Sequence, residues 1–262
     1  MTVSGKLTTS EGRLFTVEER DRIRDHVLAL GESDKRIVAG AFVGSLALNE
    51  GDRWSDLDLT FGVADEFSIY DALEDWTCQV VDEFDAIHLF DVTSGASIYR
   101  VFLLPSCLQF DLSFTPASKF GASGPKFRLL FGNAVEKPYL PSPSVHELFG
   151  YAVHHAIRGR FCIERGRYWH AEYWISSLRD FALAIACHRH KLAISYGRGF
   201  DNLPSDVLEP FKSALVASLE RDDLLRALKA AIDGLLRESV EVEELAAKVE
   251  PQLRQLTIEW NR

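Results

Sequence analysis

VGSLALNEGDRWSDLDLTF, residues 43–61, joins a glycine-serine turn to an alternating strand. In an extended strand, successive side chains point to opposite faces. One row is therefore apolar and consists of Leu57, Leu59 and Phe61. The other row carries the carboxylates of Asp56 and Asp58, roughly 6 to 7 Å apart along one ridge. The apolar row predicts a strand that covers a core.

The two carboxylates repel each other, and the repulsion grows as water is excluded. A nearby Lys or Arg would offset it, but the chain from Trp54 to Tyr99 contains neither residue type. Hard carboxylate oxygens are the ligands that Mg²⁺ prefers. The pattern therefore favours a divalent cation, and a solvated edge strand is the alternative.

A third carboxylate, Asp111, stands on the polar row of another core-building strand, LQFDLSF at residues 108–114. If this strand lies beside the first, the three carboxylates converge. Such a set can hold two Mg²⁺ ions about 3.5 to 4 Å apart, one activating an attacking oxygen and one steadying a leaving phosphate. Gly44 would let the backbone approach a phosphate, and N–H groups at a helix start at Ser45 would favour its charge.

These residues together carry a resemblance to a known superfamily. Gly44-Ser45, a gap of nine residues, the stretch from Ser55 to Leu59, and Asp111 on a later strand resemble the signature of the DNA polymerase beta-like nucleotidyltransferases. The all-helical second half makes the chain similar to the aminoglycoside and lincosamide nucleotidyltransferases. The recognisable motif covers roughly residues 40–115.

The resemblance implies an α+β protein, with a mixed-sheet nucleotidyltransferase domain at residues 1–143 and a helical-bundle domain at residues 144–262 that contributes to the acceptor cleft. It implies that Mg²⁺, as two ions, is held by three catalytic residues: Asp56, Asp58 and Asp111. It further implies that the nucleoside triphosphate is bound by Gly44, Ser45 and, as a weaker candidate, Ser55. The expected reaction moves a nucleoside monophosphate from ATP or another nucleoside triphosphate to a hydroxyl of a small acceptor and releases pyrophosphate. Related antibiotic-modifying enzymes include homodimers.

The charge balance restricts the partners. The formal net charge of −10 argues against a general nucleic-acid-binding surface and suits a small cationic acceptor better. Residues 54–99 hold eleven acids, whereas residues 158–191 are rich in Lys and Arg. The basic segment could meet a triphosphate, or its helix faces could be solvated or paired with the first domain. Lys126 and Arg128 are further candidates for neutralising phosphate.

The remaining sequence predicts an ordinary reduced protein of the cytoplasm. The four cysteines are scattered without a Cys-x-x-Cys pair, and the first residues lack the apolar run of a signal peptide. No stretch approaches about 18 consecutive apolar residues, so we expect no membrane span.

Periodicity and turn residues predict the order of the elements. We expect a helix at residues 17–30 closed by Gly31, a helix at residues 65–81 and a domain boundary in the proline-rich run at residues 136–144. The predicted strands are residues 36–44, the Asp56 strand, 86–90, 97–104 and 106–114. The predicted helices of the second half are residues 145–166, a mostly buried 168–195, 205–220, 221–239 and 242–260.

Several alternatives remain open. A general base cannot be assigned, because Asp85, Asp91 and Glu172 are each more typical of solvated acids. The histidine-rich stretches lack metal-ligand spacing, and the aromatic residues around Trp169 are more typical of packing than of ligand stacking.

Other functions also fit parts of the chain. The enzyme could modify protein or tRNA, as toxin-antitoxin relatives do, although neutralising RNA phosphates requires a basic stripe. Arg165 and His170 are loosely similar to a helical ribonuclease motif, in which Gly166 would replace a polar residue. A non-catalytic nucleotide-binding or interaction protein is the last alternative.

Overall fold

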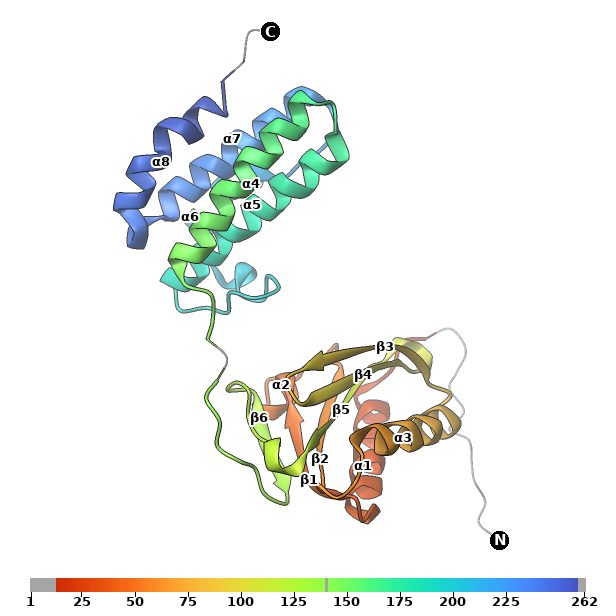
Figure 1. The fold of residues 1–262 in the computed structure, drawn as a ribbon. Helices are drawn as coiled ribbons and strands as arrows, with labels where there is room; N and C mark the ends of the chain where they lie inside the picture. The colour runs from red at the N-terminus through yellow and green to blue at the C-terminus, as the bar shows by residue number, and fades with distance from the viewer. Residues whose placement is uncertain (1–12, 140, 259–262) are drawn as a thin grey trace. The chain divides into compact units, whose positions relative to one another are not determined.

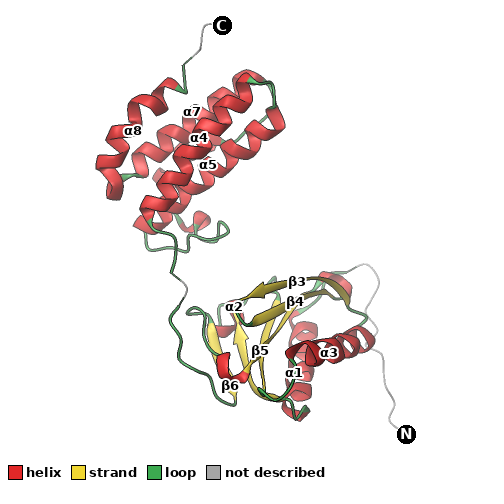
Figure 2. Ribbon diagram, viewed as in Figure 1, coloured by secondary structure: helices red, strands yellow, loops and turns green. Residues whose placement is uncertain are grey.

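The computed structural model describes residues 13–139 and 141–258. The chain divides into two compact units, Met1–Pro141 and Ser142–Arg262. The first unit combines a sheet with helices, and the second is helical (Figures 1 and 2). No described helix has the length and apolar character needed to cross a membrane.

The first unit is built on a six-stranded sheet in the order β3-β4-β5-β2-β1-β6. Strands β2 and β5 run parallel, and the other neighbours are antiparallel. The predicted mixed sheet and α+β class are confirmed. The strands are β1 Ile37–Val43, β2 Leu57–Val63, β3 Ile87–Ser94, β4 Ser97–Leu103, β5 Gln109–Pro116 and β6 Phe127–Phe131.

Two helices, α1 Val17–Ser33 and α3 Ile69–Phe84, cover one face of this sheet (Figure 1). The predicted capping box starts α1, because the backbone N–H of Glu19 donates to the Thr16 hydroxyl at 3.2 Å and the Glu19 carboxylate accepts from the Thr16 N–H at 2.8 Å. The apolar rows of β2 and β5 are buried beneath these helices. The opposite face of the sheet is left to the polar rows.

The predicted end of the first helix at Gly31 is wrong. Helix α1 continues to Ser33, and Asp34 ends it. Gly31 is required by packing instead, because a Cβ atom there would lie 2.7 Å from the ring of Phe61 in β2. A glycine inside a helix looks like a stop signal when the neighbouring sheet is unknown.

The first unit differs from the prediction in two further features. Helix α3 begins at Ile69, after the cap Ser68, four residues later than predicted. Strand β6 was not predicted, yet it pairs with β1 at the edge of the sheet. The proline- and glycine-rich residues before Phe127 hide this strand in the sequence.

The second unit contains five helices within its described residues: α4 Val145–Glu164, α5 Tyr168–Arg189, α6 Ser205–Phe211, α7 Arg221–Glu238 and α8 Glu243–Gln255. Ser144 caps α4 as predicted, with Glu147 completing the capping box. Helix α5 ends at Arg189, six residues before the predicted end, and its face with Trp169 and Tyr173 is exposed. The predicted helix at residues 205–220 is only seven residues long.

Candidate active site

The parallel pairing of β2 with β5 places two carboxylates next to each other. Asp58 and Asp111 are directly paired across the two strands, and neighbouring strands lie about 4.8 Å apart. Their sequence neighbours Leu57, Leu59 and Leu112 are fully buried on the helix-covered side. Both aspartates therefore stand on the open face of the sheet.

The charge of Asp56 also acts on Asp111. Burial raises the pKa of Asp111, and the negative charge of Asp56 raises it further, against a hydrogen bond from Gln109 Nε2 at 3.0 Å. Asp58 and Asp111 therefore stand together at the start of the polar face, and Asp56, which lies one residue before β2 and not in the strand as predicted, is near enough for its charge to act on Asp111. Across residues 13–139 and 141–258, no group of three or more His, Cys, Asp and Glu side chains is already spaced to hold a metal ion.

The Gly44 bend lies directly against one of these carboxylates. Strand β1 ends at Val43, and a single helical turn, α2 Gly44–Ala47, follows. Gly44 has a φ of 68°, and a Cβ atom there would lie 2.1 Å from Oδ2 of Asp58. The left-handed backbone and the close approach both require glycine. Two segments that the sequence separates by a loop therefore meet at this point.

A buried arginine holds the loop that leads into Asp56. The guanidinium of Arg20, on α1, is almost inaccessible to solvent, and its Nη1 donates to the carbonyls of Asp52 at 2.7 Å and Ser55 at 3.1 Å. The hydroxyl of Ser55 accepts from the Asp52 N–H at 2.9 Å and donates to the Asp52 carboxylate at 3.1 Å. The side chain of Ser55 therefore has partners inside the loop, and its role toward phosphate stays a prediction.

Hydroxyl groups continue the polar face behind the carboxylates. Ser113 donates to Thr60 at 2.8 Å, and the hydroxyls of Ser97 and Thr115 lie 2.7 Å apart, all four being buried. Burial raises the pKa of Tyr99 on β4, to which the charge of Asp58 adds. This places the phenol within the electrostatic reach of the carboxylates.

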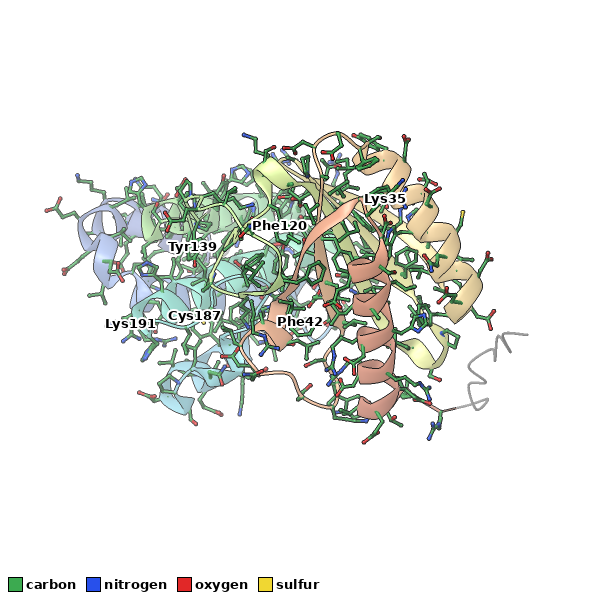
Figure 3. The ribbon with its side chains drawn as sticks, turned by 90° about the horizontal axis from the view of Figure 1, so that it is seen from below. Lys35, Phe42, Phe120, Tyr139, Cys187 and Lys191 are labelled. Carbon is green, nitrogen blue, oxygen red and sulfur yellow. The ribbon has the colours of Figure 1, made fainter. Side chains whose placement is uncertain are left out.

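A cavity of about 170 Å³ opens over three of these hydroxyls, those of Thr60, Ser97 and Thr115. Its lining includes Val43, Thr60, Tyr99 and Lys126, so it begins at the residue before the Gly44 bend. The buried ring of Phe120, labelled in Figure 3, also lines it. The cavity belongs entirely to the first unit.

Two cations, Lys126 directly before β6 and Arg128 within it, contact residues that follow the bend. Lys126 Nζ lies 3.2 Å from the carboxylate of Glu50, and Arg128 Nη1 donates to Asn49 Oδ1 at 2.7 Å. The Arg128 guanidinium also lies 4.8 Å from the ring of Phe42, which Figure 3 labels. The sequence identifies both cations as candidates for neutralising phosphate, but only the pairing of β6 with β1 shows where they lie.

The acids considered for the general base have other surroundings. Asp91 receives two hydrogen bonds from Arg100, at 2.7 and 2.8 Å, and the pKa of Asp91 is lowered by that arginine. Asp85 ends α3 with a left-handed φ of 50°. Glu172, in the second unit, accepts from the Ser176 hydroxyl at 2.7 Å. These contacts assign none of the three to catalysis.

No protein-family profile and no curated protein matches the chain. Among solved structures, an aminoglycoside 6-adenyltransferase from Bacillus subtilis matches with a TM-score of 0.40 and 11% identity, over 94% of this chain and 100% of that one. The CdnE cyclic dinucleotide synthase of Elizabethkingia meningoseptica matches with a TM-score of 0.27 and 12% identity, over 90% and 86%. Both neighbours are nucleotidyltransferases. TM-scores of this size do not establish a shared fold or a family.

Proposed function

We propose that the chain is a magnesium-dependent nucleotidyltransferase that moves a nucleoside monophosphate from a nucleoside triphosphate to a hydroxyl of a small acceptor. A cationic, hydroxylated molecule such as an aminoglycoside or lincosamide antibiotic is the proposed acceptor. The observation that supports the proposal is the direct pairing of Asp58 with Asp111 against the Gly44 bend, with the charge of Asp56 acting on Asp111.

The donor set fits magnesium. Carboxylate oxygens are hard ligands, and the repulsion between Asp56 and Asp111 is relieved by a bound cation. Asp56, Asp58 and Asp111 would hold the metal, with their side chains turning toward it. When bound, Mg²⁺ supplies positive charge for the reacting phosphate and favours ionisation of an attacking oxygen.

The chain's own residues would bind and orient the triphosphate. The backbone at Gly44 and Ser45 would approach the phosphates closely, and Lys126 and Arg128 would neutralise phosphate charge. The acceptor oxygen then bonds to the α-phosphorus while the bond from that phosphorus to the bridging oxygen breaks. The bridging oxygen keeps the electron pair and leaves with pyrophosphate, and the acceptor's hydroxyl proton passes to a base or to solvent. Catalysis rests mostly on positioning and charge neutralisation.

The proposed charge of the acceptor rests on the acidic character of residues 54–99. Part of that charge is neutralised locally, since Arg36 pairs with Asp75 at 2.6 Å and Arg100 with Glu74 at 3.0 Å. Residues 54–99 themselves contain eleven acids and no Lys or Arg, so the net charge of this segment remains strongly negative. Such a field concentrates cations near the site.

The test is pyrophosphate release with Mg²⁺, a panel of nucleoside triphosphates and a panel of acceptors. We expect Asp56→Asn and Asp58→Asn to lose turnover at least about 100-fold, as for groups that stabilise transferring phosphate. Asp82→Asn, at an exposed acid on α3, is the matched control and should keep full activity. Chelation of Mg²⁺ should stop the wild-type reaction. Full turnover in both site variants would refute the proposal, and labelling of RNA or protein alone would refute the small acceptor.

A further inference from the structure

Helix α4 carries an exposed row of aromatic rings and arginines. The row consists of Tyr151, His154, Arg158, Phe161 and Arg165. Steps of three and four residues keep all five on one face of the helix. The fourteen steps from Tyr151 to Arg165, the residue that caps α4, make the row about 21 Å long at a rise of about 1.5 Å per residue.

Helix α5 lies beside α4 and extends this surface (Figure 1). Trp169 is 79% exposed and Tyr173 58% exposed, and His170 stands between them. Trp174 joins the two helices, because its ring lies 6.0 Å from that of His154 and 5.7 Å from the Arg158 guanidinium. We name the α4 row together with Trp169, His170 and Tyr173 the α4–α5 stripe. Packing within the bundle does not account for rings left this exposed.

The arginines of the stripe keep their charge available. Three other arginines of the two helices have carboxylate partners: Arg160 with Glu164, Arg179 with Asp180 and Arg189 with Glu238. By contrast, Arg158 and Arg165 form no ion pair with any described residue and lie over the rings of Trp174 and Phe161, at 5.7 and 6.0 Å. The stripe is a local positive surface on a chain of net charge −10.

A ligand that matches this surface must carry negative charge and flat unsaturated rings, repeated over about 21 Å. A mononucleotide would occupy one ring position only, and a duplex keeps its base faces stacked inside. Single strands offer both features, and proteins bind them with aromatic side chains for the bases and cations for the backbone. We propose that the α4–α5 stripe binds single-stranded nucleic acid. The proposal does not depend on nucleotidyl transfer.

The experiment measures the fluorescence anisotropy of labelled single-stranded RNA and DNA, about 12 nucleotides long, with the full chain. Binding should be tight at about 50 mM salt and weaken as salt rises. A duplex of the same length should bind at least about 10-fold more weakly, because its bases cannot stack on the stripe. Quenching of tryptophan emission on binding would report on Trp169 and Trp174.

Substitutions separate stacking from charge. Trp169→Ala and Tyr173→Ala should each lower the affinity about 5-fold or more. Arg158→Gln and Arg165→Gln should lower the affinity and reduce the slope of log affinity against log salt by about 0.7 each. Tyr196→Ala and Arg198→Gln are matched controls, because this exposed ring and arginine lie 5.4 Å apart outside the stripe. Unchanged circular dichroism would confirm that each variant is folded.

Four results would overturn the proposal: no binding at low salt, equal affinity for single strands and duplex, equal losses in the control variants, or binding of anionic lipid vesicles in place of oligonucleotides. Asp56→Asn separates this site from the proposed active site. Oligonucleotide binding should be unchanged in that variant, whether or not the wild-type chain transfers nucleotides.

Discussion

The substitution Gly44→Ala tests the contact between the bend and Asp58. A Cβ atom at Gly44 would lie 2.1 Å from Asp58 Oδ2, whereas real Cβ atoms essentially never approach within 3.0 Å. The carboxylate must therefore move by roughly 1 Å, and a misplacement of that size can lower kcat about 100-fold. The left-handed φ of 68° adds a loss of about 1 to 2 kcal/mol in the free energy of unfolding.

A second glycine separates these two effects. Gly95, in the turn between β3 and β4, has a φ of 60° and nothing within 4 Å of its would-be Cβ. Gly95→Ala should therefore lose similar stability, about 1 to 2 kcal/mol, but keep its activity. Urea unfolding measures the first quantity, and pyrophosphate release with saturating Mg²⁺ measures the second.

The comparison has one decisive outcome. If Gly44→Ala and Gly95→Ala retain the same turnover, the position of the Asp58 carboxylate does not matter to the reaction, and the assignment of the site to this corner of the sheet fails. A loss of turnover in Gly44→Ala that exceeds the loss in Gly95→Ala supports it.

Three further predictions concern stability. Asp111→Asn should raise the melting temperature of the metal-free chain at neutral pH, because burial and the charge of Asp56 raise the pKa of Asp111 and so penalise its charged form in the fold. This gain in melting temperature should vanish as the pH falls below 3.8, the ordinary pKa of an aspartate. Scanning calorimetry with a chelator measures both effects. Burial alone would raise the pKa of Asp34, but hydrogen bonds from Arg36 and Trp76 hold it at about 2. The charged carboxylate should therefore contribute about 2 kcal/mol to the free energy of unfolding, fully present above pH 3.8 and lost as the pH falls toward 2. Urea titrations should show this loss in the wild type but not in Asp34→Asn. Gly31→Ala should lower the free energy of unfolding by about 1 kcal/mol or more, because the added Cβ would contact the ring of Phe61. Gly150→Ala, in open space on α4, should instead raise the free energy of unfolding by up to about 1 kcal/mol. A gain in both variants would contradict the packing reason for Gly31.

The sequence predicted the parts of the site that depend on local alternation. Leu57 and Leu59 between aspartates, and the same pattern around Asp111, were sufficient to separate a buried row from a polar row. The sequence alone does not show that Asp58 and Asp111 are direct neighbours, because strand pairing is a contact between residues that are distant in the sequence. The parallel register of β2 and β5 supplies it.

Features set by tertiary packing were not predictable. Gly31 resembles a helix end, and only the ring of Phe61 shows why a glycine continues the helix. Strand β6 is a short apolar run after glycine and proline, and only its pairing with β1 determines where Lys126 and Arg128 lie. Nothing in the sequence predicts the role of Arg20, because a buried arginine that donates to loop carbonyls has no local pattern.

The parallel pairing also determines which changes of chain length the protein can tolerate. Fifty-odd residues separate the two paired aspartates, and the tip of the β3–β4 hairpin lies among them in exposed positions. Residues added at that tip leave β5 where it is. A single residue inserted within β5 ahead of Asp111 would instead turn that side chain toward the helices and bring an apolar one to the open face. Natural variation in length should therefore collect at the hairpin tip and be absent from the first half of β5.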